Sequence, residues 1–200
     1  MSSLISIKPG WPLHLRLISL LLGFTVLSEI LITRLVSKIW PHTTNIAWYN
    51  IVMGIEFCVY AGYYYLVLQN KRIKMLVVLY LTILPLFWFV VTFKVFSIND
   101  WNSYLDVAGS IVTVCLSVAL YYQLFTEPEL VRLSSSSEFW IATALIIYYC
   151  GTLPFAGMMH FLTRNFPVLA DNFVTMLQVL NIVLYSLIAY AFLCRISMKK

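Results

Sequence analysis

Long apolar runs alternate with short polar breaks along the chain, and this pattern predicts helices that cross a membrane. A spanning helix needs about 20 predominantly apolar residues, and the stretch 75–93 has this character. Spanning β-strands would instead alternate over about 10 residues. The runs therefore predict about six spans, at about 13–34, 46–69, 74–97, 104–125, 139–162 and 168–194.

The polar breaks and prolines predict local features of these spans. The serine-rich stretch 133–138 predicts a loop that ends in a helix N-cap, because serine hydroxyls accept hydrogen bonds from the free N–H groups of a first turn. Pro85 predicts a kink within the third span, because proline removes a helical hydrogen bond. Gly151, Pro154 and Gly157 are expected to disturb the second half of the fifth span.

Composition supports the same fold class. Hydrophobic residues make up 62% of the 200 residues and charged residues 10%, whereas soluble domains average about 45–50% and about 25%. The mean hydropathy is +0.88. These values exclude a soluble globular enzyme, a disordered tail and a disulfide-stapled secreted module. The predicted fold is an all-α, polytopic transmembrane bundle, with residues 1–200 forming a single transmembrane domain.

The distribution of basic residues predicts orientation and partners. With six spans, nine Lys and Arg residues fall on the side of the termini and four on the other side. This bias predicts that both termini are cytoplasmic. The expected location is the cell (inner) membrane. The net charge of +5 comes from basic residues near span ends, so membrane lipids are the expected partners and nucleic acid is not.

Two carboxylates lie at membrane depth, where ionisable groups are costly and are functional candidates. Glu56 lies at the middle of the second span, and Glu29 lies past the middle of the first. Each is about ten residues from the loop that joins the spans, which places both at one depth, about 15 Å below the same surface. Both are therefore candidates for a ligand site or an ion path. The alternative is that each glutamate only fixes packing through hydrogen bonds across the bundle.

Polar residues on the sixth span recur every three or four positions and share one helical face. They are Asp171, Thr175, Gln178, Asn181 and Tyr185. This face is expected to point into the bundle or a wet cavity, and Gln178 and Asn181 join the candidates for a ligand or ion path. Structural hydrogen bonding is the favoured alternative. On the fourth span, Gly109, Thr113 and Ser117 predict close helix packing.

A second set of polar groups is expected at the outer ends of the spans. These outer-rim candidates are Lys94, Asp106, His160, Arg164 and Asp171. Lys94 could equally reach the membrane surface, and His160 lacks a nearby set of metal ligands. Aromatic residues near span ends are interpreted as interfacial belts: Trp40, Trp48, Tyr63–Tyr65, Trp101, Tyr121, Tyr122 and Trp140.

The sequence lacks the signatures of common enzyme and cofactor sites. It contains no glycine-rich phosphate loop, no G-x-S-x-G elbow and no H-E-x-x-H pair. Its four cysteines lie in apolar runs without a C-x-x-C pair, so they are interpreted as small buried hydrophobes. We therefore expect no metal, no cofactor and no catalytic residues. Whether the protein is an enzyme is open at this point, and the absence of enzyme activity is favoured.

Three segments carry a family resemblance. They are Tyr49-Asn50-Ile51 through Glu56-Phe57, Tyr121-Tyr122-Gln123-Leu124, and Phe139-Trp140-Ile141 with Tyr148 and Gly151. Over about residues 45–192, the chain resembles small six-helix integral membrane proteins of Bacteroidetes-type bacteria. The resemblance implies a sensory or accessory role beside a membrane signalling partner of the histidine-kinase type, and it implies no activity.

Three functions remain open from the sequence. The first is a membrane sensor or accessory module that binds a small or lipidic ligand, or a partner's transmembrane helix. The second is an ion or proton channel, a small transporter or a pore-forming effector that uses the midplane carboxylates, with a homo-oligomer expected. The third, and least favoured, is an intramembrane lipid-modifying enzyme with paired carboxylates as acid and base.

Overall fold

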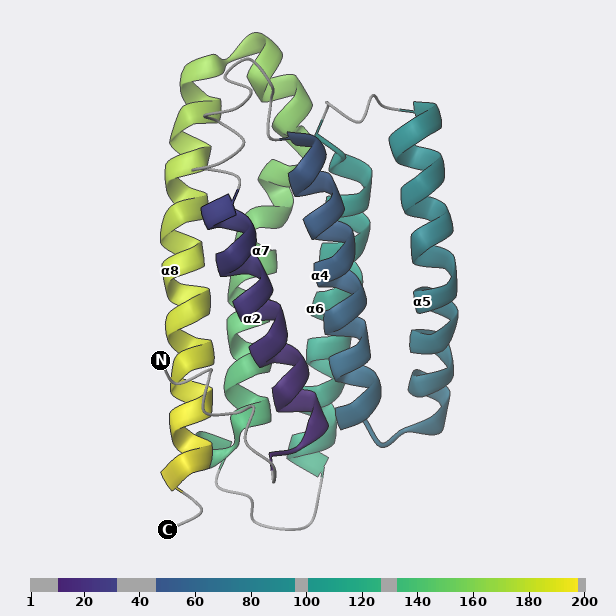
Figure 1. Ribbon diagram of the computed structural model, residues 1–200, viewed down its shortest axis with the longest axis vertical. Helices are drawn as coiled ribbons and strands as arrows, with labels where there is room; N and C mark the ends of the chain where they lie inside the picture. Colours follow the sequence, from purple (N-terminus) through teal and green to yellow (C-terminus); the bar gives the residue numbers. More distant parts are fainter. Residues whose placement is uncertain (1–10, 32–45, 96–100, 127–132, 198–200) are drawn as a thin grey trace.

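The computed structural model describes residues 11–31, 46–95, 101–126 and 133–197. These residues form six long α-helices and two short helical segments (Figure 1). In chain order they are α2 (Leu13–Leu31), α4 (Ile46–Val67), α5 (Lys71–Val90), η2 (Val91–Val95), α6 (Ser103–Thr126), η3 (Leu133–Ser135), α7 (Ser137–Asn165) and α8 (Pro167–Ser197). Within the described ranges no strand is present, and the predicted all-α bundle is confirmed.

Five of the helices contain a segment long and apolar enough to cross a membrane. The segments are Leu13–Ile30, Lys71–Val90, Ser103–Thr126, Ser137–Met158 and Thr175–Arg195. The remaining long helix, α4, corresponds to the second predicted span and carries Asn50, Glu56 and several tyrosines. Helix α4 packs against α2, α5 and α6, and Asn50 is fully buried. The protein is thus a helical, multi-pass membrane bundle in which α4 packs against three other helices.

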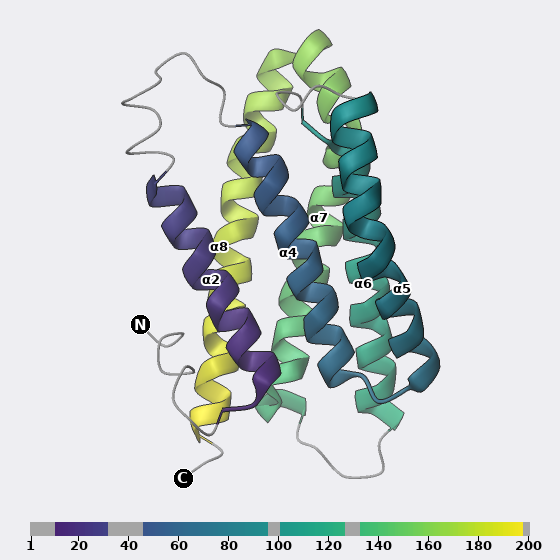
Figure 2. The same ribbon diagram turned by 45° about the vertical axis from the view of Figure 1, so that its right-hand side comes forward.

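The helices form one elongated bundle with two distinct ends (Figures 1 and 2). Helix α2 begins and α8 ends at the same end, which we call the basic end because it carries Arg16, Lys71, Arg72, Lys74 and Arg195. Helix α7 packs along both α6 and α8, and α5 lies at the edge against α4. The six long helices of the described residues run in alternating directions, so the start of α2 and the end of α8 lie at one end (Figure 1). The cytoplasmic location of that end stays a prediction.

Helix ends agree with the predicted bounds to within a few residues. Ser136 caps α7, and its hydroxyl accepts a hydrogen bond from the Phe139 N–H at 3.3 Å, which confirms the predicted N-cap. Asn70 caps α5 through the Arg72 N–H at 2.9 Å, so α5 begins at Lys71 rather than at the predicted position 74. The predicted end of the first span, position 34, lies outside the described residues.

Both helices with an internal proline continue past it, and the predicted kink at Pro85 stays a prediction. Helix α5 continues through Pro85 to Val90 and ends in a π-helical turn, and α7 continues through Pro154 to Asn165. The expected disturbance of α7 does not interrupt its helical hydrogen bonding enough to end the helix. A proline costs the helix interior one backbone donor, which packing within a bundle compensates.

Close packing of α6 against α4 confirms the role predicted for the small residues of the fourth span. Gly109 lies so close to Phe57 that a Cβ atom there would be 2.2 Å from a ring carbon. One and two turns further on, Thr113 and Ser117 are buried, and the Ser117 hydroxyl hydrogen-bonds the hydroxyl of Tyr64. The small side chains therefore let the aromatic residues of α4 pack directly on α6.

Two interpretations of residue types near the surface are wrong. Tyr63 and Tyr64 are fully buried inside the bundle rather than in an interfacial belt. The Tyr63 ring contacts His14 of α2, and the Tyr64 hydroxyl hydrogen-bonds Ser117 of α6. Tyr65 alone of that group is exposed. Cys115 and Cys150, expected as buried thiols, lie on the exterior of the bundle.

Candidate functional site

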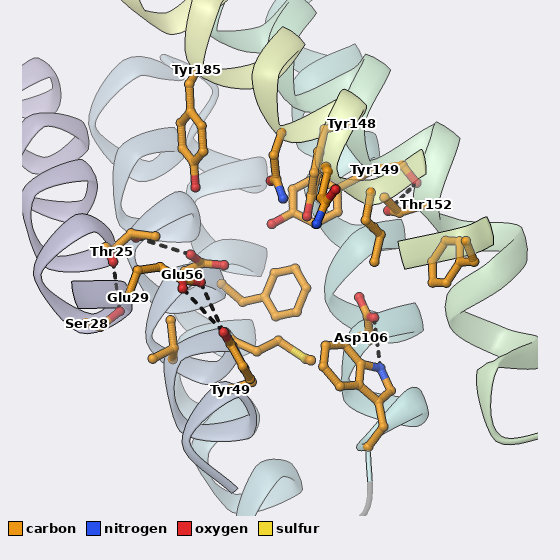
Figure 3. A pocket seen from close by; sticks show the side chains of 18 residues that line it. Thr25, Ser28, Glu29, Tyr49, Glu56, Asp106, Tyr148, Tyr149, Thr152 and Tyr185 are labelled. Carbon is orange, nitrogen blue, oxygen red and sulfur yellow. Dashed lines mark hydrogen bonds between the residues drawn. The ribbon is translucent and has the colours of Figure 1, made fainter. Parts of the chain in front are cut away.

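A cavity of about 410 Å³ opens between the helices in the half of the bundle remote from the basic end (Figure 3). Its lining comes from the second half of α2, the first halves of α4, α6 and α8, and the middle of α7. The lining residues are Thr25, Ser28, Glu29, Tyr49, Val52, Met53, Glu56, Phe57, Trp101, Asp106, Tyr148, Tyr149, Thr152, Phe173, Leu177, Gln178, Asn181 and Tyr185. All four candidates for a ligand or ion path, Glu29, Glu56, Gln178 and Asn181, are among them.

Glu56 projects into the cavity from the middle of α4. The hydroxyl of Thr25 on α2 donates a hydrogen bond to Glu56 Oε1 at 3.4 Å. A side pocket of about 30 Å³ adjoins the cavity, and Glu56, Thr25, Asn181 and Tyr185 line it too. Glu56 therefore lies where α2, α4 and α8 meet, and its known partner is a neutral hydroxyl rather than a cation.

Glu29 lies on the same wall of the cavity as Glu56. The hydroxyl of Tyr49 donates to both carboxylate oxygens of Glu29, at 3.2 and 3.4 Å, as Figure 3 shows. Both glutamates thus line one cavity, and the equal depth expected for them stays a prediction.

Asp106 adds a third carboxylate on a different wall. It lies in the first turn of α6, where Trp101 Nε1 donates to it at 3.3 Å and the Ser110 hydroxyl at 3.4 Å. In Figure 3 it lies across the open space from Glu29 and Glu56. The sequence assigned Asp106 to an outer rim, but the structure places it in the lining of the cavity itself.

The polar face of the sixth span reaches the cavity over part of its length. Gln178, Asn181 and Tyr185 line it, whereas Thr175 is exposed and does not. Within the part of the chain that the structure describes, no hydrogen bond is found for the amide of Gln178 or Asn181. The hydrogen-bonding role favoured for these amides from the sequence is therefore not seen between described residues, and both amides face open space.

The predicted outer rim is not brought together by the described residues. Lys94 is exposed in the π-helical turn and is not part of the cavity lining. The side chains of His160, Arg164 and Asp171 lie outside the described residues, as do Arg34, Lys38 and Trp40. Of the five rim candidates, Asp106 alone is placed at the cavity.

Sequence reasoning missed the hydroxyls and aromatic rings of the lining. Thr25, Tyr49, Tyr149 and Thr152 carried no separate signal, and Trp101 was interpreted as part of an interfacial belt. The signal that could have found Tyr49 and Thr152 is helical spacing, since Tyr49 is seven residues before Glu56 and Thr152 is four after Tyr148. Trp101 precedes α6 and could be found only from its contact with Asp106.

The chemistry of the cavity is acidic and aromatic. Its described lining includes three carboxylates and seven aromatic rings, but no Lys, Arg or His. Among the described residues, no group of three or more His, Cys, Asp and Glu side chains is arranged to hold a metal ion. Fold and cavity together define a multi-pass helical membrane protein with an acidic, aromatic cavity. Comparison with protein-family models, curated proteins and solved structures finds no match for the chain.

Proposed function

We propose that the protein is a membrane sensor or accessory module of the inner membrane, which binds a small or lipidic ligand in the cavity of Figure 3. The observation that carries this proposal is the convergence of Glu29 and Glu56 on one cavity of about 410 Å³. Sites for small molecules occupy about 300–1,000 Å³ and combine an apolar lining with a few polar groups. The cavity meets both conditions.

The rest of the bundle supports binding rather than conduction. Between the cavity and the basic end, the interior is filled by side chains that are fully buried or nearly so. They include Leu15, Ile18, Tyr63, Tyr64, Leu120, Ile141, Leu145, Ile188 and Phe192. An ion path would have to cross this packed layer, whereas a binding site needs access from one side only.

Output in this proposal passes through helix contacts, because little of the described chain lies outside the helices. The edge helix α5 packs on α4 and leaves most of its apolar side chains exposed, among them Met75 and Leu86, at 69% and 67%. Lipid, a second copy or a transmembrane helix of a signalling partner could cover that face. The resemblance to bacterial six-helix proteins favours a partner of the histidine-kinase type.

The proposal is tested by filling the cavity. Leu177 on α8 lines the cavity, so Leu177→Trp places a larger ring in its open space. Leu193→Trp is the matched control, because Leu193 is on the same helix, is 54% exposed and does not line the cavity. In lipid nanodiscs, compounds that raise the unfolding temperature of the wild type and of Leu193→Trp should not stabilise Leu177→Trp. If every stabilising compound acts equally on both variants, the cavity is not the binding site.

The channel or transporter alternative predicts a different result. Because Glu56 and Asn181 are polar groups at mid-depth on two helices, an ion or proton path would pass between them. Liposomes with the reconstituted protein would then show a flux that Glu56→Gln abolishes. The ligand-binding proposal expects no such flux in either protein.

A further inference from the structure

We infer that the cavity takes an organic cation with an apolar tail, which reaches it sideways from the lipid between α2 and α8. This inference rests on the proposed function and names the ligand class for the same cavity. It depends on three features of the lining: its charge, its aromatic rings and the position of its exposed residues.

The charge of the lining selects for a cation. Glu29, Glu56 and Asp106 come from three helices and face one space, and the described lining supplies no basic side chain. The hydrogen-bond donors seen on Glu56 and Asp106 are neutral: the Thr25 hydroxyl, the Trp101 indole and the Ser110 hydroxyl. Such donors stabilise a carboxylate without neutralising it. A bound cation would therefore balance the negative charge of the carboxylates, and an anion would be repelled.

The aromatic rings select for an organic cation rather than a metal ion. Phe57, Trp101, Tyr148, Tyr149 and Phe173 line the cavity, together with Tyr49 and Tyr185. Ring faces attract large, weakly hydrated cations such as ammonium groups that carry alkyl substituents. A metal ion instead requires several oxygen ligands within about 2–2.6 Å, whereas Asp106 lies across the open space from Glu29 and Glu56 (Figure 3).

The exposed lining residues place the opening on the side of the bundle. Of the polar lining residues, Glu29, Gln178 and Tyr185 are exposed, and these belong to α2 and α8. The same two helices present exposed apolar residues beside them: Val26, Leu27 and Ile30 on α2, and Val179 and Ile182 on α8. The opening is thus framed by lipid-facing side chains, so a bound head group inside the cavity can keep its tail in the bilayer.

The inference is tested with decyltrimethylammonium as the probe and with two comparison compounds. Decyl sulfate has the same tail and the opposite charge, and tetramethylammonium has the same head group without the tail. Binding to the protein in nanodiscs is measured by titration, and partition into empty nanodiscs is subtracted. Decyltrimethylammonium should bind at least about tenfold more tightly than either comparison compound, a difference of about 1.4 kcal/mol.

Charge variants give the matched controls. Glu56→Gln keeps the size of the side chain and removes its charge, and it should weaken binding of decyltrimethylammonium about tenfold. Gln178→Glu adds a carboxylate to the lining and should tighten binding, whereas Gln69→Glu, at the basic end beyond α4, should leave it unchanged. Equal affinity of the wild type and Glu56→Gln, together with no gain in Gln178→Glu, would overturn the inference.

The outcomes also separate this inference from the proposed function. If decyl sulfate or an uncharged compound binds better and Leu177→Trp abolishes that binding, the cavity is a ligand site and the assigned charge is wrong. If decyltrimethylammonium binds equally to wild type and Leu177→Trp, its binding lies outside the cavity and the inference fails. If no compound depends on Leu177, the proposed function fails as well.

Discussion

Two neighbouring tyrosines of α4 show how differently one residue type can be used in this bundle. Tyr63 and Tyr64 are both fully buried, and their rings are in edge-to-face contact. The Tyr64 hydroxyl hydrogen-bonds Ser117, whereas the Tyr63 hydroxyl has no hydrogen-bond partner among the described residues. A buried polar group without a partner is destabilising, and a satisfied one is costly to remove.

We predict opposite effects for removing these two hydroxyls. Tyr64→Phe should lower the free energy of unfolding by about 1 kcal/mol, because it removes a buried hydrogen bond. Tyr63→Phe should leave stability unchanged or raise it, because it removes an unpaired hydroxyl. Thermal unfolding of the two variants in the same detergent measures the difference. A loss in Tyr63→Phe equal to that in Tyr64→Phe would show that Tyr63 has a partner outside the described residues.

At this scale, the sequence identified the acids better than their partners. Glu56 and Glu29 stand out because carboxylates are rare within apolar runs. Thr25 and Tyr49 do not stand out, because hydroxyls are common in membrane helices and only the relative height of α2 and α4 brings them to the glutamates.

Individual helices are set largely by the apolar runs and the residues that end them. Ser136 fixes the start of α7, and Asn70 fixes the start of α5. What the runs do not give is the distance between two helices, which depends on side-chain size at the contact. Gly109 sets that distance for α4 and α6, because the ring of Phe57 occupies the space where a Cβ atom would lie.

Replacing this glycine should therefore separate the two helices. We predict that Gly109→Ala lowers the free energy of unfolding by about 1–3 kcal/mol, the usual cost of overpacking. Because Phe57 also lines the cavity, ligand binding should weaken in the same variant. Both effects are measured in nanodiscs, by thermal unfolding and by titration.

Gly23 in α2 provides the matched control. A Cβ atom there would meet nothing within 4 Å, so Gly23→Ala should not lower stability and should favour the helix slightly. The double variant Gly109→Ala with Phe57→Leu should recover part of the loss, since the clash involves both side chains. If Gly109→Ala is as stable as Gly23→Ala, α6 can move away from α4 at no cost.

The arrangement of the whole molecule depends on contacts between residues far apart in the chain. His14 Nε2 and Glu138 Oε1 are 3.0 Å apart at the basic end, and they join the first turn of α2 to the first turn of α7. Hydroxyls of Ser136 and Ser137 also donate to Glu138. Nearby, the rings of Trp11 and Phe192 are 6.1 Å apart and join the start of α2 to α8.

We predict that breaking the His14–Glu138 contact weakens the attachment of α2. Glu138→Gln should lower the unfolding temperature, because an ionised acceptor for His14 and two serines becomes a neutral amide. Affinity for a ligand in the cavity should change less than twofold, because Glu138 lies at the other end of the bundle. The check is thermal unfolding beside titration with decyltrimethylammonium, and His14→Ala should give a similar loss of stability.

These long-range contacts are the part of the fold that the sequence did not predict. Six apolar runs define six helices, but nothing in a run says which distant helix it will face. His14 and Glu138 are 124 positions apart. A histidine at the start of one helix does not predict a glutamate at the start of another as its partner. The cavity arises from that arrangement, because its lining combines four helices and the start of a fifth.

The attachment of α2 has a mechanical consequence for any occupant of the cavity. At the basic end the helix is held by α7 and α8, while near the cavity the hydrogen bonds of Thr25 and Glu29 run to α4. A guest that draws Glu29 and Glu56 towards itself would thus tilt α2 about its fixed start rather than slide it. The displacement would be greatest where α2 ends, and the bundle could in this way report occupancy on the face of the membrane opposite the basic end.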